Sequence, residues 1–233
     1  IVSLASAIAV TVVPILSESL ASHNMRNIRK QLEDSIILFL FIMIPGALGM
    51  AAVAQPLNTL FYSYDQIGTL ILQISAFTAI ALGFFTVISA LMQGLSRNRD
   101  IIRYYLIGLL VKIIIQLPCI YFLSTAGPLV ATAIGMMVAS IMAMYDLEVN
   151  FGIRYVKLLP KINRILVYAI LTYVTARLVV YGLNFVLNEQ SKTQSFLIVA
   201  LAVMAGGAVY LYLALRSRMA DLMIGTKAAG LRR

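Results

Sequence analysis

Two basic side chains lie deep inside otherwise apolar stretches of the sequence, and they are the first candidates for chemistry. Arg177 follows Arg164 by thirteen residues, about 20 Å along a helix. Lys112 follows Arg103 by nine residues, about 13 Å along a helix. A charged side chain in a hydrocarbon layer about 30 Å thick is costly unless it faces a cavity or a partner. The chemistry that such cations favour is the binding of an anionic group.

Arg177 shares one helical face with three polar residues, Tyr173, Tyr181 and Asn184. We predict that this face borders a polar groove, where Arg177 contacts an anionic lipid group or water and the other side chains supply hydrogen bonds. The alternative is that Arg177 bonds tyrosine hydroxyls and backbone carbonyls of the last apolar segment. In that case Arg177 only holds two helices together.

Lys112 has one polar neighbour on its own helical face, Gln116, one turn later. Two interpretations stay open for this pair. It lines a cavity and contacts a substrate, or Lys112 extends its ammonium group along the helix toward the membrane surface.

Residues for catalysis or metal binding are scarce in the sequence. His23 is the only histidine, and a catalytic site at a membrane face usually needs histidines or paired carboxylates. The carboxylates of Asp146 and Glu148 flank the end of an apolar segment, where we expect solvated charges. We therefore predict no catalytic residue, no metal site and no cofactor.

The elements that must position these side chains are long apolar helices. Of the 233 residues, 61% are hydrophobic and 12% are charged, which is typical of a membrane protein. Runs of about 20 continuously apolar residues match the thickness of a bilayer and favour helices over alternating barrel strands. The predicted fold class is all-α, a polytopic bundle of transmembrane helices with seven spans, at residues 1–20, 35–54, 67–95, 104–123, 128–147, 165–187 and 196–215.

Basic residues are concentrated in the connections that follow the first, third, fifth and seventh spans. Of the 18 Lys and Arg residues, only Lys112, Arg177 and Lys192 lie elsewhere. The positive-inside rule places these connections in the cytoplasm, with the N-terminus outside and the C-terminus inside. The net charge of +9 is distributed over short segments between apolar spans, so the predicted partners are anionic lipid headgroups and other membrane lipids, and not nucleic acid.

Helix-breaking residues inside two spans are candidate hinges. Pro14 lies near the end of the first span, and Pro45, Gly46 and Gly49 lie at mid-membrane depth in the second. For the second span, close packing against a neighbouring helix is an equally weighted alternative. The fifth span carries small residues every fourth position, which predicts a packing seam, at Ala131, Gly135, Ala139 and Ala143.

Three stretches carry a resemblance to a known family. They are Pro14-Ile15-Leu16-Ser17 after an Ala/Ser-rich run, AQPLNTLFY at 54–62, and LMQGLSRNRDIIRYYLIGLLVKI at 91–113. The chain resembles the polysaccharide-exporter branch of the multidrug/oligosaccharidyl-lipid/polysaccharide exporter superfamily. Within this branch it is most similar to MurJ-type lipid II flippases of Gram-positive bacteria.

The resemblance implies that the seven spans are the last seven of fourteen. Because the sequence starts with Ile1 inside an apolar run, we expect the chain to be a fragment whose partner is the missing N-terminal lobe. The implied organisation is a C-terminal transporter lobe at 1–147, a cytoplasmic interfacial connector at 148–164, a two-helix hairpin lining a lipid groove at 165–215, and a basic tail at 216–233 that lies along the membrane surface.

The implied function is transport and not catalysis. A V-shaped helical transporter in the bacterial cytoplasmic membrane would turn a polyprenyl-pyrophosphate-linked glycolipid across the bilayer by alternating access. The charged cavity residues of such flippases lie mainly in the missing lobe, so no family site residue transfers to this sequence. Two alternatives stay open: a cation-coupled multidrug exporter of the same superfamily, which would need a carboxylate within a span, and a multipass lipid-modifying enzyme.

Overall fold

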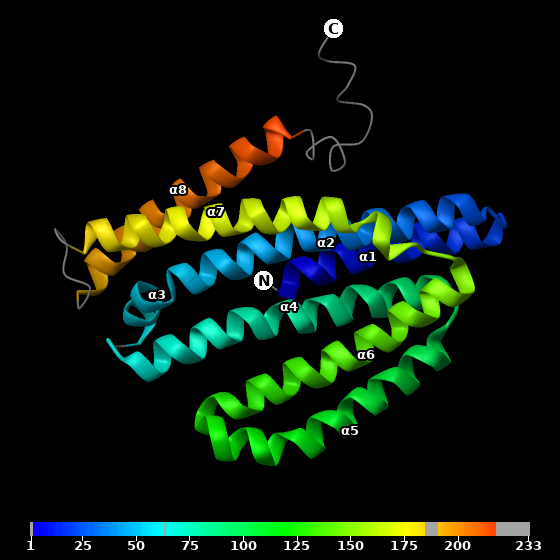
Figure 1. The fold of residues 1–233 in the computed structure, drawn as a ribbon, viewed down its shortest axis with the longest axis horizontal. Helices are drawn as coiled ribbons and strands as arrows, with labels where there is room; N and C mark the ends of the chain where they lie inside the picture. Colours follow the sequence, from blue (N-terminus) through cyan, green and yellow to red (C-terminus); the bar gives the residue numbers. More distant parts are fainter. Residues whose placement is uncertain (1, 63, 185–190, 218–233) are drawn as a thin grey trace, which may run out of the picture. The chain divides into compact units, whose positions relative to one another are not determined.

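The computed structural model describes residues 2–62, 64–184 and 191–217, and these residues fold into helices without a strand. Apolar segments of this length can satisfy their backbone hydrogen bonds inside a bilayer only within the helix itself. Figure 1 labels the helices in chain order: α1 (Val2–Ala21), α2 (Met25–Ala52), α3 (Ala54–Phe61), α4 (Gln66–Gly94), α5 (Asn98–Leu123), α6 (Gly127–Phe151), α7 (Leu159–Leu183) and α8 (Lys192–Arg216), with short 3₁₀ turns at Ser124–Ala126 and Tyr155–Lys157.

Six segments of the described residues are long and apolar enough to cross a membrane. One of them, Asn98–Phe151, has 54 residues and would be about 80 Å long as a single helix, far more than a bilayer needs. The turn at Ser124–Ala126 divides it into α5 and α6, which run back along each other. Each of the seven predicted spans therefore lies mainly on one helix, although the second runs past the end of α2 and the sixth extends beyond the described residues. The prediction of an all-α, polytopic transmembrane bundle is confirmed.

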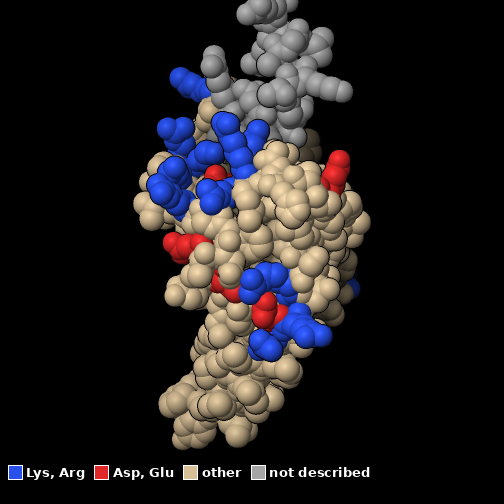
Figure 2. Space-filling view, turned by 90° about the vertical axis from the view of Figure 1, so that its right-hand side faces the viewer, with Lys and Arg blue, Asp and Glu red and all other residues tan. Residues whose placement is uncertain are grey.

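Several helices extend beyond the predicted spans into polar sequence. α2 begins at Met25, so the cations Arg26, Arg29 and Lys30 lie on its first turns. The side chain of Asn24 starts this helix, because its Oδ1 accepts the backbone N–H of Asn27 at 3.1 Å. Figure 2 shows the molecule from the right-hand side of Figure 1, and Lys and Arg side chains gather in clusters on this face.

The described chain forms two compact units. Unit 1 comprises Ile1–Met43 and Phe77–Ile162, and unit 2 comprises Ile44–Ala76 and Asn163–Arg233. The core of unit 1 is formed by large side chains from α1, the first half of α2, the second half of α4 and the end of α6. Its fully buried members include Leu16, Ile28, Leu32, Phe39, Met43, Ile88, Leu91, Met92 and Leu147.

The predicted packing seam lies between α5 and α6 in unit 1. Ala131, Ala139 and Ala143 are fully buried. At Gly135 a Cβ atom would lie 2.5 Å from the carbonyl oxygen of Gly108, so the two helix backbones approach closely where both residues lack a side chain. The prediction of a packing seam is confirmed.

The connection between α6 and α7 is held against the start of α2. Gly152 ends α6 with a left-handed φ of 68°, a conformation that suits glycine. The Nε–H of Arg29 donates to the carbonyl oxygen of Phe151 at 2.6 Å. The hydroxyl of Tyr155 donates to the carbonyl oxygen of Met144 at 2.9 Å. Burial, and secondarily the charge of Glu148, raise the pKa of Tyr155, so this hydroxyl stays a donor at neutral pH.

Unit 2 contains α3, α7 and α8. The side chains of Val53, Val180, Ile198 and Ala202 form its buried cluster. α7 and α8 approach closely at Gly206, where a Cβ atom would lie 3.4 Å from the side chains of Ala176 and Thr172. This hairpin corresponds to the last two predicted spans. The predicted surface helix of the tail lies outside the described residues from position 218 onward.

Candidate functional site

Arg177 reaches the end of another helix of unit 2. Its Nη1 donates to the carbonyl oxygen of Ala52 at 3.4 Å. Ala52 is the last residue of α2, and the last carbonyls of a helix lack intrahelical donors and carry a partial negative charge. The guanidinium therefore supplies a positive charge and one long hydrogen bond to this helix end. If Arg177 only held two helices together, we expected it to bond a backbone carbonyl of the last predicted span. The carbonyl that it contacts belongs instead to the second predicted span.

Most of the hydrogen-bonding capacity of Arg177 remains unused within the described residues. A guanidinium group has five N–H donors, and one of them has a partner there. The Arg177 side chain is exposed, as is Tyr181 one turn later, whereas Tyr173 one turn earlier is half-buried. This face of α7 can therefore bind an oxyanion or water in addition to the Ala52 carbonyl.

Lys112 and Gln116 lie on α5 in unit 1, whereas Arg177 belongs to unit 2. The stem of Lys112 lines the packing seam, since a Cβ atom on Gly135 would lie 2.9 Å from the Cβ of Lys112. Both side chains are half-buried, and neither the ammonium group nor the Gln116 amide has a hydrogen-bond partner among the described residues.

The hinge candidates have different surroundings. Pro14 lies on an exposed position inside α1. Pro45 is buried inside α2, which continues to Ala52. Cβ atoms on Gly46 and Gly49 would have no atom within 4 Å. Close packing at these two glycines, the alternative to a hinge, therefore does not occur within the described chain. The boundary between the two units falls at Ile44, next to Pro45.

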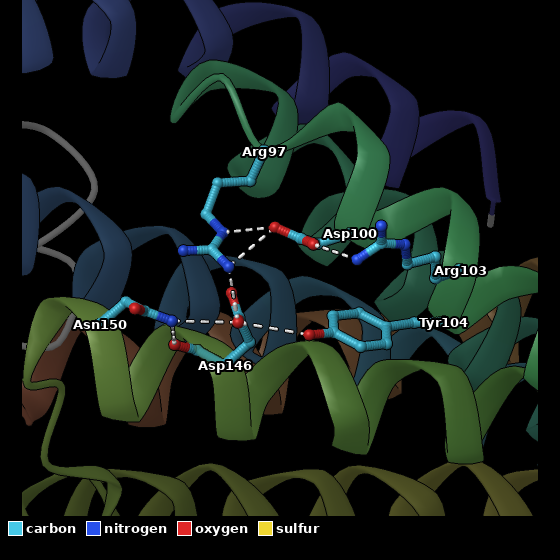
Figure 3. Close-up of polar contacts among 6 residues, drawn as sticks. All are labelled: Arg97, Asp100, Arg103, Tyr104, Asp146 and Asn150. Carbon is cyan, nitrogen blue, oxygen red and sulfur yellow. Dashed lines mark hydrogen bonds and ion pairs between the residues drawn. The ribbon is translucent and has the colours of Figure 1, made fainter.

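A group of polar side chains that the sequence did not single out joins the α4–α5 turn to the end of α6 in unit 1 (Figure 3). The Arg97 guanidinium bonds Oδ2 of Asp100, at 2.7 Å from Nη2 and 2.9 Å from Nε. Its Nη2 also lies 2.9 Å from Oδ1 of Asp146. Arg103 contributes a longer, exposed contact of 3.5 Å to Asp100.

Asp146 is the centre of this group and is not the solvated charge that we expected. Its side chain is only 9% exposed, because α6 continues to Phe151 and carries Asp146 inside the packed end of unit 1. Its Oδ1 also accepts hydrogen bonds from the hydroxyl of Tyr104 at 3.2 Å and from the amide of Asn150 at 3.0 Å. Oδ2 is buried without a hydrogen-bond partner.

The chemistry of these groups is binding and positioning. The described residues contain no cluster of three or more His, Cys, Asp or Glu side chains that could hold a metal ion. Arg97 neutralises the buried carboxylate of Asp146 and thereby fixes the α4–α5 turn against α6. Arg177 and Lys112 lie inside apolar helices without a carboxylate partner among the described residues, so each is available to bind an anion.

These features define a polytopic helical membrane protein with two cations, Lys112 and Arg177, inside its apolar helices. The model of the MatE family matches residues 1–117, half of the chain, and the chain therefore belongs to the MatE family.

Two further comparisons extend over nearly the whole chain. The chain is 27% identical over 234 residues to the lipid II flippase MurJ of Bacillus subtilis (strain 168), a match that covers 98% of this chain and 43% of that protein. It is also similar to a solved structure of a lipid II flippase MurJ in an inward closed conformation. That match has a TM-score of 0.70 and 19% identity and covers 94% of this chain and 45% of the other. At that identity the structural match shows the fold. The chain spans less than half the length of both proteins.

Proposed function

We propose that the full-length protein moves a polyprenyl-pyrophosphate-linked cell-wall precursor, of the lipid II type, across the bacterial cytoplasmic membrane. The observation that carries this proposal is the 27% identity to a lipid II flippase over 98% of the chain. Translocation proceeds by alternating access and makes or breaks no bond in the substrate. In this proposal the protein is a transporter and not an enzyme.

The proposed architecture assigns residues 1–147 to the C-terminal lobe and 165–215 to the additional hairpin that lines a groove for the lipid chain. The connector at 148–164 and the basic tail at 216–233 lie at the cytoplasmic surface. An N-terminal lobe completes the transporter, in keeping with the 43% share of the relative that this chain spans. The concentration of basic residues supports an outside N-terminus and a cytoplasmic C-terminus.

Arg177 is the proposed contact for the anionic part of the substrate or for an anionic lipid headgroup. Its support is the exposed guanidinium with one long hydrogen bond to the end of α2. Lys112, half-buried and without an ion-pair partner in the described chain, is proposed as a second contact, together with Gln116.

A cation-coupled exporter is the main alternative within the same fold. Such an exporter needs a carboxylate that is free to bind a sodium ion or a proton inside the membrane domain. Asp146 is a buried carboxylate, but Arg97 already lies 2.9 Å from it, and this neighbour opposes the binding of a second cation. The structure therefore gives this alternative no specific support. For a lipid-modifying enzyme, the described residues offer no group of three or more His, Cys, Asp or Glu side chains that could hold a catalytic metal ion.

Depletion of the protein in living cells tests the proposal. A flippase for the cell-wall precursor should leave lipid-linked precursor protected on the cytoplasmic face when it is depleted. The measurement is the fraction of precursor that an enzyme added outside can cleave. An unchanged fraction, together with lost efflux of small cations or dyes, would instead support the exporter. Turnover of labelled lipid by the purified protein would support the enzyme.

A further inference from the structure

A small polar hollow lies at the turn between α3 and α4, entirely within unit 2. Its volume is about 150 Å³, below the range of about 300 to 1,000 Å³ that is usual for drug-sized ligands. It therefore has room for one ring-sized group. All but one of its lining residues carry polar side chains: Gln55, Tyr64, Asp65, Gln66, Thr69 and Gln73.

The hollow opens close to one membrane surface. α4 has 29 residues and is about 44 Å long, whereas the hydrocarbon core is about 30 Å thick. The length of α4 therefore exceeds the thickness of the core, and the hollow is formed around the first turns of the helix. Phe61, Tyr62 and Tyr64 next to it are exposed, as aromatic side chains at a membrane–water boundary commonly are.

The walls of the hollow are held in place by the turn itself. The carboxylate of Asp65 accepts the backbone N–H groups of Ile67 at 3.2 Å and Gly68 at 2.9 Å, which starts α4. The buried side chain of Asn58 donates to the carbonyl oxygen of Asp65 at 3.2 Å. Across the hollow, the amide of Gln55 donates to the hydroxyl of Tyr64 at 3.0 Å. The site is therefore preorganised and not formed by loose loop side chains.

Two amide side chains remain free to bind a ligand. Gln66 is exposed and Gln73 half-buried, and neither has a hydrogen-bond partner among the described residues. Each amide offers an acceptor oxygen and two N–H donors. The hydroxyl of Tyr64, which accepts from Gln55, can still donate. The free groups are thus neutral donors and acceptors. Gln66 and Gln73 lie about two turns apart along α4.

The charge of the hollow selects against ionic ligands. No Lys or Arg lines it, so a phosphate or pyrophosphate group would find no cation. The Asp65 carboxylate would also repel such an anion. A positively charged amine is not favoured either, because both carboxylate oxygens already accept hydrogen bonds from the N-terminus of α4, which weakens their attraction for a cation. A neutral group with amides and hydroxyls matches the lining best.

We infer that the hollow at the α3–α4 turn is a binding site for a neutral saccharide that bears hydroxyl and amide groups. Gln66 and Gln73 supply the paired donors and acceptors that such a sugar requires. The assignment to a lipid-linked glycan rests on the proposed function. In the proposed orientation the hollow opens on the outer side, so it binds the sugar headgroup after translocation. Arg177, the proposed contact for an anion, is not among its lining residues.

Saturation-transfer NMR on the full-length protein in lipid nanodiscs tests this inference. The probe is N,N′-diacetylchitobiose, a neutral disaccharide with two amide groups; one of its two rings fits the hollow and the other extends out of it. The double variant Gln66→Leu/Gln73→Leu removes both free amides without breaking a hydrogen bond within the described chain. We expect saturable binding to the unsubstituted protein and about tenfold weaker binding to the double variant.

The matched control is Gln93→Leu, at the other end of α4, where the amide bonds Ser89 at 3.0 Å and does not line this hollow. It should bind the disaccharide like the unsubstituted protein. Inorganic pyrophosphate should not compete. An absence of saturable binding, equal binding by the double variant, or competition by pyrophosphate would each overturn the site. If the protein transports precursor but fails these tests, the proposed function stands and the site does not. If the disaccharide binds in the hollow but depletion leaves the exposure of precursor unchanged, the site stands and the proposed function does not.

Discussion

Arg97 and Asp146 are 49 positions apart in the sequence, and Nη2 of Arg97 lies 2.9 Å from Oδ1 of Asp146. This pair connects the turn between α4 and α5 to the last part of α6. The Arg97 side chain is 27% exposed and that of Asp146 9%, so solvent screens the pair much less than a surface ion pair. The pair thus fixes the start of α5 to the end of α6, across the hairpin that these two helices form.

The first prediction concerns the removal of this cation. Arg97→Ala leaves the buried carboxylate of Asp146 with two neutral donors and no positive charge. We expect a loss of about 2–3 kcal/mol in the free energy of unfolding, because an uncompensated buried charge is costly. The measurement is unfolding of the purified protein in detergent. Arg103→Ala is the control, since Arg103 is 72% exposed and 3.5 Å from Asp100, and should cost less than about 0.5 kcal/mol. Equal losses in the two variants would contradict this account.

The seam between α5 and α6 gives the second prediction. Gly135→Ala places a Cβ atom 2.5 Å from the carbonyl oxygen of Gly108 and 2.9 Å from the Cβ of Lys112. Because backbone cannot move aside cheaply, we expect a loss of about 1–3 kcal/mol in stability. Gly207→Ala in α8 is the matched control, since a Cβ there meets no atom within 4 Å. A thermal melt should show the first variant destabilised and the second unchanged or slightly stabilised. The reverse order would show that the helices are not packed in this way.

The left-handed residue that ends α6 gives the third prediction. Gly152→Ala adds a side chain at a φ of 68°, and its Cβ would lie 2.8 Å from Nη2 of Arg29. The backbone strain costs about 1 kcal/mol, and displacement of Arg29 would also weaken its hydrogen bond to Phe151. Gly46→Ala, at a helical position with no neighbour within 4 Å, should not lower the melting temperature. If both substitutions have the same effect, Gly152 is not required for its conformation.

Helix positions followed from hydropathy because each apolar run is long enough to cross a bilayer and can satisfy its backbone only as a helix. The ends of the helices could not be predicted from hydropathy. The break between α2 and α3 at Val53 lies within the sequence Ala-Ala-Val-Ala, which carries no polar or turn-forming residue. The predicted span therefore ran past Ala52, and the carbonyl that Arg177 contacts was hidden inside it.

Candidate site residues were predictable only where a single residue conflicts with its surroundings. Arg177 and Lys112 could be identified because a charge in an apolar run is costly by itself. Asp146 lies near the end of such a run, where a solvated carboxylate is ordinary, and its burial depends on Arg97 from a distant turn. The hollow at the α3–α4 turn likewise depends on how Gln55 and Tyr64 meet. The available signal for Asp146 was a carboxylate about one helical turn after Ala143, the last small residue of the packing seam.

The fourth prediction concerns the orientation in the membrane. In a cysteine-free background, single cysteines can replace the exposed residues Tyr62, Asn98, Asn163 and Thr193. A reagent that does not cross the membrane should label Tyr62→Cys and Thr193→Cys in intact cells, and should label Asn98→Cys and Asn163→Cys only after permeabilisation. The reason is the concentration of basic residues beside positions 98 and 163. Labelling of Asn98→Cys in intact cells would reverse the proposed orientation.

The last prediction concerns Arg177. Its two proposed roles can be distinguished, because one affects the stability of the protein and the other affects transport. As a partner of the Ala52 carbonyl, it contributes one hydrogen bond of 3.4 Å, a length at which such bonds are weak. As a contact for an anionic group, it contributes the donors that have no partner within the described chain. The first role predicts a loss of stability on substitution, and the second predicts a loss of transport.

We expect the second outcome. Arg177→Leu keeps an apolar helix that inserts readily, so the protein should reach the membrane and its melting temperature should change by no more than about 2 °C. Transport of lipid-linked precursor should fall about tenfold or more, because a charge-assisted contact contributes roughly 1.5–3 kcal/mol. Arg177→Lys should retain part of the transport, since it keeps the charge but not the planar arrangement of donors. Leu178→Ala, the exposed neighbour on another face of α7, is the control and should transport normally. A folded Arg177→Leu protein with full transport would leave Arg177 only its contact with the end of α2.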